Sequence, residues 1–410
     1  MMTRIIFLSI LLLVIDLLAF QAVRHLVSSA GRPLKTIVYL AYWIVPVITV
    51  LYLIGFSAGW SEQLPKTLQV ILRTMIFIFY FAKLLVAVII LIDDVRRLLF
   101  GALNFSFKDL SLSTGRSDFM SYGALILGVI PIVSLTYGMA RNPYRYKLHK
   151  ANIPIKDLHP ELQGLKIVQI SDIHSGSFLY KEPVERSIEM INAEKPDIVF
   201  FTGDLVNARA DEMEPFVEMF SKIEAPLGVY SILGNHDYGD YHHWPSEEAK
   251  KQNFEDLKTM HQKLGWTLLL NEHRAIQLKE TFFNVIGVEN YSASPRFPKH
   301  GDLRRATEGM NKDTFNVLLS HDPSHWEAQV TNDHQDIHLT LSGHTHGFQF
   351  GVEIPGWIRW SPIQYVYPQW AGLYEKASQY LYVNRGLGYL GYPGRVGILP
   401  EITLLTLQAS

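Results

Sequence analysis

Five short segments of this 410-residue chain carry aspartate, histidine and asparagine, which bind divalent metal ions through oxygen and nitrogen. In chain order they are Asp172-Ile173-His174, Gly203-Asp204, Gly234-Asn235-His236-Asp237, His321 and Gly343-His344-Thr345-His346. Each segment alone also occurs in ordinary turns and helix caps. Their joint occurrence in this order predicts a site that holds two divalent metal ions and hydrolyses a phosphoester bond.

Two of these segments contain a pair of ligand residues separated by one residue. Side chains two positions apart in an extended segment point to the same face. Asp172 and His174 can therefore bind one cation together. His344 and His346 can approach two neighbouring cations in the same way. The spacing predicts that both pairs bind metal.

The remaining ligand candidates are single residues. The Asp204 carboxylate has two oxygens and can bridge two cations, while Asn235 offers an amide oxygen and His321 a ring nitrogen. Nitrogen and oxygen ligands without sulfur favour manganese, iron or zinc over magnesium or calcium. Two such ions can bind phosphoryl oxygens while an activated water attacks the phosphorus.

Two residues beside Asn235 are predicted to act in catalysis. His236 can protonate the leaving oxygen or stabilise charge on the phosphoryl group. For Asp237 the sequence leaves two alternatives open, because it can orient the His236 ring or cap the turn.

Short apolar runs bounded by turn residues precede the ligand segments and predict buried strands. These strands are expected over residues 166–170, 197–201, 229–233, 315–319 and 337–341. Helices are expected over residues 183–193, 211–223, 247–264 and 323–330. Alternating strands and helices predict an α/β sheet, and ligands at the ends of neighbouring strands can converge at one edge of it.

Strands follow one another more closely toward the C-terminus. They are expected over residues 266–270, 275–278, 282–287, 380–383 and 402–407. This spacing predicts a second, partly antiparallel sheet that packs on the first to form a sandwich.

The first 140 residues are mostly apolar and contain four stretches close to the about 20 residues that cross a bilayer. The stretches are residues 5–23, 36–56, 68–92 and 119–139. Asp16 and Lys83 interrupt two of them and are interpreted as a pair between helices, with a functional site as the alternative. The predicted organisation is a four-span transmembrane domain (1–140), a linker (141–164) and a catalytic domain (165–410).

The orientation in the membrane rests on one weak signal, because basic residues divide almost equally between the two sides. Residues 113–120, before the fourth span, resemble a twin-arginine export signal with one arginine left. We therefore expect a multi-pass protein of the cytoplasmic (inner) membrane whose catalytic domain is extracytoplasmic.

Composition excludes several classes of function. The net charge of -2 and the isoelectric point near 6.8 give no basic field for nucleic acid. The absence of cysteine excludes disulfides, thiolate metal sites and cysteine nucleophiles. The expected partners are a phosphoester substrate, which can be lipid-linked, and membrane lipids, and no nucleic acid is expected.

Outside the ligand segments, three further features are candidates for substrate contact. Arg385 and Arg395 can bind a second phosphate, with structural pairing, for example to Glu401, as the alternative. Tyr238, Tyr241 and the pair His242-His243 can line the substrate entry or form a polar surface loop. Residues 357–374 are rich in tryptophan and tyrosine and can cover a lipid chain, lie at the bilayer interface or form a packed lid.

The complete set of ligand segments resembles the calcineurin-like metallophosphoesterases over residues 165–407. Residues 384–388 and 400–402 are similar to a membrane-associated branch that includes enzymes acting on UDP-2,3-diacylglucosamine. The resemblance implies a four-layer α/β/β/α sandwich with a binuclear metal site. It implies a first metal held by Asp172, His174, Asp204 and His346. It implies a second held by Asp204, Asn235, His321 and His344, with His236 as the catalytic histidine.

Three functions remain in competition. The leading one is a membrane-anchored hydrolase of a phosphodiester or pyrophosphate bond in a lipid-linked or cell-envelope substrate. A cytoplasm-facing UDP-2,3-diacylglucosamine pyrophosphatase of lipid A synthesis is the alternative within the same chemistry. A non-catalytic metal-dependent sensor or binding protein belongs to another class, and His236 argues against it because a binding module needs no catalytic histidine.

Overall fold

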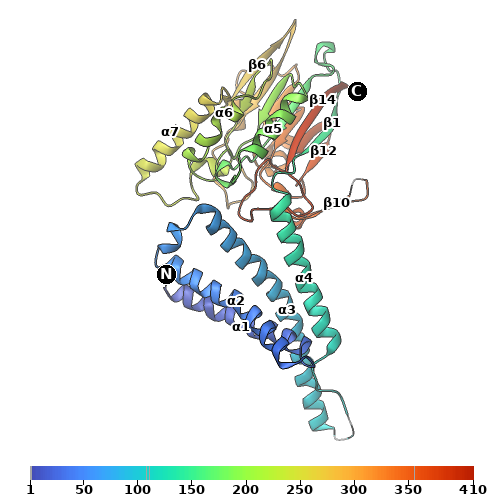
Figure 1. The fold of residues 1–410 in the computed structure, drawn as a ribbon. Helices are drawn as coiled ribbons and strands as arrows, with labels where there is room; N and C mark the ends of the chain where they lie inside the picture. The colour runs from blue at the N-terminus through green and yellow to red at the C-terminus, as the bar shows by residue number, and fades with distance from the viewer. Residues whose placement is uncertain (1, 108, 110, 355) are drawn as a thin grey trace. The chain divides into compact units, whose positions relative to one another are not determined.

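The computed structural model describes residues 2–410 except residues 108, 110 and 355. The chain divides into two compact units, Met1–Tyr137 and Gly138–Ser410 (Figure 1). We call them unit 1 and unit 2.

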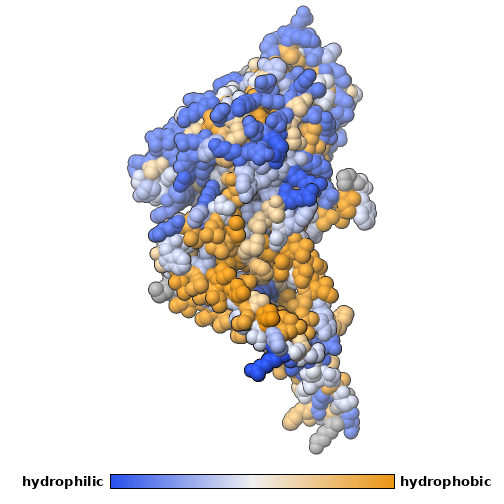
Figure 2. All heavy atoms as spheres, in the orientation of Figure 1, coloured by the Kyte–Doolittle hydropathy of each residue, from blue (hydrophilic) through white to orange (hydrophobic). Residues whose placement is uncertain are grey.

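Unit 1 is built from apolar helices. They are α1 (Met2–Leu26), α2 (Arg32–Ser57), α3 (Lys66–Ser106) and α4 (Asp118–Arg141), the last of which continues into unit 2. Within the described residues, four helices are long and apolar enough to cross a membrane. Many of their leucine, isoleucine and valine side chains are exposed, and apolar residues dominate their surface in Figure 2. An apolar outer surface of this kind is what helices surrounded by lipid require.

Asp16, at the centre of the candidate span Ile6–Leu26, pairs with a lysine of another helix. Lys83 Nζ lies 2.7 Å from Asp16 Oδ1, and the Tyr80 hydroxyl donates to Asp16 Oδ2 at 2.8 Å. The Lys83 ammonium also lies 4.3 Å from the centre of the Tyr42 ring. These contacts satisfy both charges in an apolar setting, as expected of a pair between helices.

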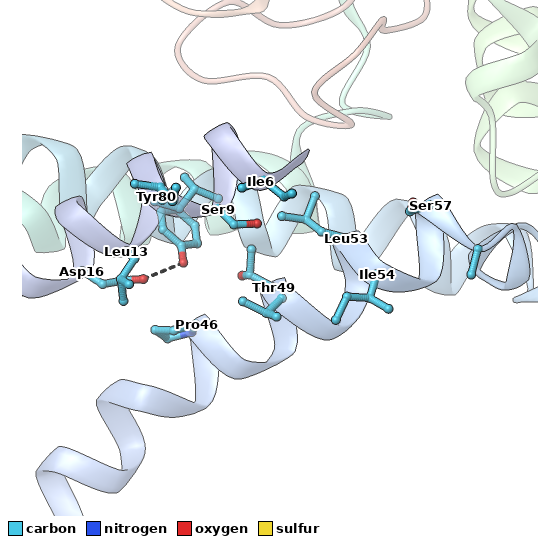
Figure 3. A pocket seen from close by; sticks show the side chains of 14 residues that line it. Ile6, Ser9, Leu13, Asp16, Pro46, Thr49, Leu53, Ile54, Ser57 and Tyr80 are labelled. Carbon is cyan, nitrogen blue, oxygen red and sulfur yellow. Dashed lines mark hydrogen bonds between the residues drawn. The ribbon is translucent and has the colours of Figure 1, made fainter. Parts of the chain in front are cut away.

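A cavity of about 730 Å³ lies beside this pair within unit 1 (Figure 3). Its walls are mostly apolar side chains of α1 and α2, such as Leu13 and Ile54. Ser9, Thr49 and the Asp16–Tyr80 hydrogen bond supply its polar surface.

Unit 2 contains two six-stranded sheets. The first has the order β1 (Lys147–Ile155), β14 (Glu401–Ala409), β2 (Lys166–Ile170), β3 (Ile198–Phe201), β4 (Val229–Ser231) and β5 (Thr267–Leu268). The second has the order β12 (Gly372–Lys376), β13 (Gln379–Val383), β9 (Leu339–Ser342), β8 (Asn316–Leu319), β7 (Thr281–Gly287) and β6 (Glu272–Leu278). Strands β2, β3 and β4 are parallel, as are β7, β8 and β9. The short strands β10 (Val352–Ile354) and β11 (Ile358–Trp360) form a separate antiparallel hairpin.

The two sheets and their helices form four layers. In β2, Val168 and Ile170 pack with the helices on the first sheet, whereas Ile167 packs between the sheets. The helices on the first sheet are α5 (Glu182–Ala193), α6 (Val217–Phe220) and α7 (Glu247–Lys263). Helix α8 (Leu303–Ala306) and the π-helical turn Trp326–Val330 pack on the second sheet. Side-chain alternation thus builds the inner layer, and the predicted α/β/β/α sandwich is confirmed.

The structure differs from the sequence prediction in four segments. Residues 141–164, expected as a linker, contain β1, which pairs with β14 at the edge of the first sheet. Strands β5 and β14, expected in the second sheet, belong to the first. Residues 211–223 hold two 3₁₀ turns and the short α6 in place of one helix. The edge position explains β1, because an edge strand tolerates the polar residues and prolines that suggest a linker.

Candidate metal centre

The predicted ligands lie just beyond the carboxyl ends of five strands. Asp172 follows β2, Asp204 follows β3, and Asn235 follows β4 in the first sheet. His321 follows β8 and His344 follows β9 in the second sheet. Parallel strands bring their carboxyl ends to one edge, so both sheets deliver ligands to the same rim of the sandwich.

The backbone at this rim is strained. Asp172, His174, Asp204, His344 and His346 all have positive φ angles, between 45° and 69°. This left-handed conformation is uncommon for residues other than glycine and concentrates at functional sites. The positive φ angles turn each side chain out of the direction that a continuing strand would give it.

The glycines beside the ligands allow a close approach of neighbouring segments. A Cβ atom on Gly343 would lie 2.2 Å from Asp172 Oδ2, and one on Gly203 would lie 2.6 Å from the backbone nitrogen of Gly234. The segments around β2, β3, β4 and β9 could not come together at these distances with larger residues.

Two ligand groups result. The first joins Asp172, His174 and His346, and the second joins Asp204, His321 and His344. Within each group the ligand atoms lie within 4.8 Å of one another. Asp204 Oδ2 lies 3.1 Å from His321 Nε2 and 3.6 Å from His174 Nε2, so its carboxylate stands between the groups. This arrangement brings together six of the predicted metal ligands.

Three observations test whether divalent cations fit these groups. His174 Nε2 and His346 Nε2 face each other at 3.0 Å, so that both ring nitrogens point at one position. The Asn235 Oδ1 atom is buried without a hydrogen-bond partner among the described residues. His321 Nδ1 lies 2.7 Å from the Thr202 carbonyl oxygen, which leaves its Nε2 lone pair free for a metal. All three fit a pair of bound cations.

The electrostatics of the groups point the same way. Burial lowers the pKa of His174 to about 3, so its ring is neutral at pH 7. Burial opposes ionisation of Asp172, yet the contact with His346 holds its pKa below the usual range. Burial likewise opposes protonation of His321, but the Asp204 carboxylate raises the pKa of His321 to about 10. This strong attraction for a proton is an attraction for positive charge, which a divalent cation satisfies equally well.

His236 stands beside the ligands with its ring fixed by the backbone. Its Nδ1 lies 2.7 Å from the Asn207 carbonyl oxygen, and its backbone N–H donates to Asp204 Oδ1 at 2.8 Å. The Tyr241 ring packs against it with centroids 4.3 Å apart, and the Tyr241 hydroxyl accepts from Asn235 Nδ2 at 2.9 Å. A proton on Nδ1 donated to Asn207 leaves Nε2 as the atom that can exchange protons with a substrate.

Asp237 supports the backbone of the site and makes no contact with the His236 ring among the described hydrogen bonds. Its Oδ2 accepts from the N–H groups of Gly234 and Asp204 at 2.9 Å each. Its Oδ1 accepts from Leu205 at 2.8 Å and from Val206 at 3.3 Å. Of the two alternatives that the sequence leaves open, these contacts favour the cap, and they tie the loop after β3 to the loop after β4.

We expect Asp237→Asn to lower the free energy of unfolding by roughly 3 kcal/mol, because an amide offers one acceptor oxygen where the carboxyl group of Asp237 uses two. The melting temperature of the purified protein in detergent measures this loss. The control is Asp256→Asn, which changes an exposed carboxylate on α7. An unchanged melting temperature of Asp237→Asn would show that the four hydrogen bonds do not hold the loops.

Two residues of the site escaped the sequence prediction. The Tyr367 hydroxyl lies 2.9 Å from His344 Nε2 and donates to Asp322 Oδ2 at 3.2 Å. Asp322 Oδ2 itself lies 3.6 Å from His344 Nε2. Tyr367 and Asp322 thus hold the Nε2 side of the His344 ring. The Nδ1 atom of the same ring then faces His321 Nε2 at 3.3 Å. The adjacency of Asp322 to His321 was the available signal, whereas Tyr367 lies in the aromatic stretch 357–374, which the sequence predicted to contact lipid or form a lid and not to contact a metal ligand.

The two arginines proposed for phosphate binding have partners within the protein. Arg385 pairs with Glu401 and Glu353, both at 2.5 Å, and is 2% exposed. Arg395 is fully buried and donates through Nη2 to the carbonyl oxygen of Gly386 at 3.1 Å. These contacts favour the structural alternative for both residues, and for Arg385 they include the predicted pairing with Glu401.

Of the residues proposed for the substrate entry, one lies at the site and the others lie elsewhere. Tyr241 lies at the site, as described above. Tyr238 is buried and stacks on Phe254 and His300. His242 and His243 are exposed, and His242 packs against Trp244. Only Tyr241 of this set contacts His236 among the described ring contacts.

Comparison with known proteins identifies both halves of the chain. Residues 2–143 match a family described as "Probable Calcineurin-like phosphoesterase, transmembrane domain", and residues 165–348 match "Calcineurin-like phosphoesterase". A "Transmembrane protein with metallophosphoesterase domain" of Danio rerio is 30% identical over 322 residues, which cover 75% of this chain and 69% of that protein. The "Uncharacterized metallophosphoesterase YkuE" of Bacillus subtilis is 30% identical over 293 residues, which cover 70% of this chain and 95% of that protein. The chain therefore belongs to the calcineurin-like phosphoesterase family and carries that family's transmembrane domain at its N-terminus.

Proposed function

We propose that this protein is a membrane-anchored phosphoesterase that uses two divalent metal ions to hydrolyse a phosphodiester or pyrophosphate bond. One observation carries the proposal: the Asp204 carboxylate stands between two buried ligand groups, with the non-ligand His236 held beside it. Manganese, iron and zinc fit the mixed nitrogen and oxygen donors.

Each ligand has a proposed place. Asp172, His174, Asp204 and His346 would hold the first ion. Asp204, Asn235, His321 and His344 would hold the second. When bound, the two ions supply positive charge for the phosphoryl group and lower the pKa of a water molecule. The strained backbone and the close glycines keep these side chains in place before substrate arrives, which limits the cost of reorganisation.

His236 is proposed to donate a proton to the leaving oxygen. The Asn207 carbonyl fixes the Nδ1 side of the ring, so Nε2 can carry the proton that the leaving oxygen accepts. Tyr241 covers one face of the ring and restrains its rotation. A donor at this position would also stabilise negative charge that develops on the phosphoryl oxygens during bond cleavage.

Hydrolysis of bis(p-nitrophenyl) phosphate by the metal-depleted full-length protein, with and without added manganese, tests the proposal. We expect turnover that depends on the metal. Parallel assays with p-nitrophenyl phosphate and with a UDP-linked pyrophosphate show whether a monoester or a pyrophosphate bond is cleaved as well as the diester bond. Stoichiometric metal binding without turnover of any of the three substrates would favour the sensor or binding protein instead.

We further propose that the substrate carries a lipid. The support is the family's transmembrane domain, which holds the catalytic unit on the membrane where lipid substrates are concentrated. The test compares kcat/KM for a long-chain phosphodiester with that for its short-chain counterpart in matched detergent. We expect a higher value for the long chain, because burial of each methylene near the site adds up to about 0.8 kcal/mol. Equal values would remove the case for a lipid substrate.

The cytoplasmic membrane, with unit 2 on its extracytoplasmic side, is the proposed location. Its support is the export-like sequence of residues 113–120, which runs into the first turn of α4. A C-terminal fusion to alkaline phosphatase, which is active only outside the cytoplasm, tests this orientation. An inactive phosphatase fusion together with a fluorescent C-terminal fusion to green fluorescent protein would contradict this orientation.

A further inference from the structure

Exposed apolar side chains of unit 2 are concentrated in one segment. Among its described residues, seven of the nine large apolar side chains that are exposed lie within residues 348–366. They are Phe348, Val352, Ile354, Trp357, Ile358, Tyr365 and Val366. Trp357 is 82% exposed and Tyr365 is 77% exposed. A contiguous apolar surface of this kind on an otherwise polar domain marks an interaction site.

The segment includes the hairpin of β10 and β11, which projects from unit 2 (Figure 1). This hairpin pairs with neither six-stranded sheet. A two-stranded hairpin alone is only marginally stable in water and needs a surface to pack against. We therefore expect another surface to cover the exposed face of the hairpin.

The two charged residues of this segment, Glu353 and Arg359, both contact other residues of unit 2. Glu353 pairs with Arg385 at 2.5 Å. Arg359 donates to the Ala371 carbonyl oxygen at 2.7 Å and lies over the Trp370 and Tyr374 rings. No other charged residue occurs between positions 348 and 366. Glu353 is thus paired within unit 2, whereas the exposed Arg359 can keep its guanidinium at the headgroup level, as arginine does at a membrane interface.

Hydrogen bonds within unit 2 connect this segment to the end of the candidate membrane span α4. The last turn of α4 belongs to unit 2, and the Gly138 carbonyl accepts from the Arg395 N–H at 3.2 Å. The next residue, Val396, donates to the Gln349 carbonyl at 2.7 Å and accepts from the Gly351 N–H at 2.9 Å. Strand β10 begins at the following residue. A short path of hydrogen bonds thus joins the end of α4 to the start of the hairpin.

Helix α4 is a candidate membrane span of 24 residues, about 36 Å long at 1.5 Å per residue. Its last turn therefore reaches the edge of a hydrocarbon core of about 30 Å. The hydrogen bonds through Arg395 and Val396 connect the start of the hairpin to this last turn, and tryptophan and tyrosine are the preferred side chains of a membrane interface.

We propose that residues 348–366 of unit 2 insert into the interface of the bilayer that α4 crosses. The occupant of the apolar surface is lipid, and neither a second copy nor another protein is needed to cover it. The segment lies next to the metal centre, because Tyr367, the residue after it, contacts His344, and Ser361 Oγ donates to the Gly347 carbonyl at 2.9 Å. Insertion would hold the metal centre next to the lipid surface.

The absence of cysteine from the chain allows a direct test. Single-cysteine variants Val352→Cys and Val366→Cys of the full-length protein are labelled with an environment-sensitive fluorophore and reconstituted in phosphatidylcholine vesicles. Glu280→Cys, in the exposed turn of the β6–β7 hairpin, is the matched control. Quenchers carried on the lipid chains and quenchers dissolved in water are then compared. All three positions leave the metal ligands and Trp357 unchanged.

We expect the lipid-borne quencher to remove most of the fluorescence at positions 352 and 366 and little of it at position 280. We expect the reverse order for the water-soluble quencher. Equal access of water-soluble quencher to all three positions would overturn the proposal. Protection of positions 352 and 366 from both quenchers would overturn it too, since protein and not lipid would then cover the surface.

Discussion

An Asp204→Asn variant is expected to lose nearly all hydrolysis and to retain fewer metal ions than the wild-type protein. The Asp204 carboxylate lies 3.1 Å from His321 Nε2 and 3.6 Å from His174 Nε2, so the substitution removes negative charge from both ligand groups at once. It also replaces an ionised acceptor of the His236 N–H with a neutral one. Elemental analysis of the purified protein and turnover of a chromogenic phosphodiester measure the two losses.

Asp256→Asn serves as the control for charge, because this exposed carboxylate lies on α7 away from the ligands. Thermal unfolding of Asp204→Asn separates loss of metal from loss of the fold. Two metal ions per folded chain together with activity near that of the wild type would rule out Asp204 as the shared ligand.

A His236→Ala variant is expected to keep both metal ions and to lose roughly 10²–10⁴-fold in kcat, the usual contribution of a general acid. The His236 ring contacts the Asn207 carbonyl and the Tyr241 ring, and it belongs to neither ligand group. The loss should be smaller for p-nitrophenolate, which leaves without a proton, than for an alkyl leaving group. Turnover of the two substrates by the same preparations measures this difference.

His159→Ala is the matched control, because this exposed histidine lies in the turn before β2. Loss of metal from His236→Ala, measured by elemental analysis, would make His236 a ligand and would exclude its role as a proton donor. An equal loss of rate for both leaving groups would point to charge stabilisation in place of proton transfer.

The ligand segments could be recognised from the sequence because each is local. The run 166–170 followed by Asp172 and His174 contains the strand, the turn and the ligands within a few residues. The same holds for Asp204 after β3 and for His321 after β8. Strand ends in a parallel sheet meet at one edge, so local patterns were enough to predict which residues converge.

Features that depend on distant parts of the chain could not be predicted in the same way. Strand β1 exists because it pairs with β14, more than 240 residues later, and its own polar sequence resembles a linker. The role of Tyr367 depends on its contact with His344 across a folded loop. The partners of Arg385 likewise come from β10 and β14. Pairing between distant segments is decided by packing in three dimensions, which a single sequence does not display.

The most direct test of the binuclear site is a titration of the metal-depleted full-length protein with Mn²⁺, in which bound metal and phosphodiester turnover are measured in the same samples. Two ligand groups with the Asp204 carboxylate between them predict binding of two ions per chain, with most of the turnover appearing as the second ion binds. Saturation at one ion per chain with full turnover, or turnover that needs no bound metal, would contradict the binuclear account.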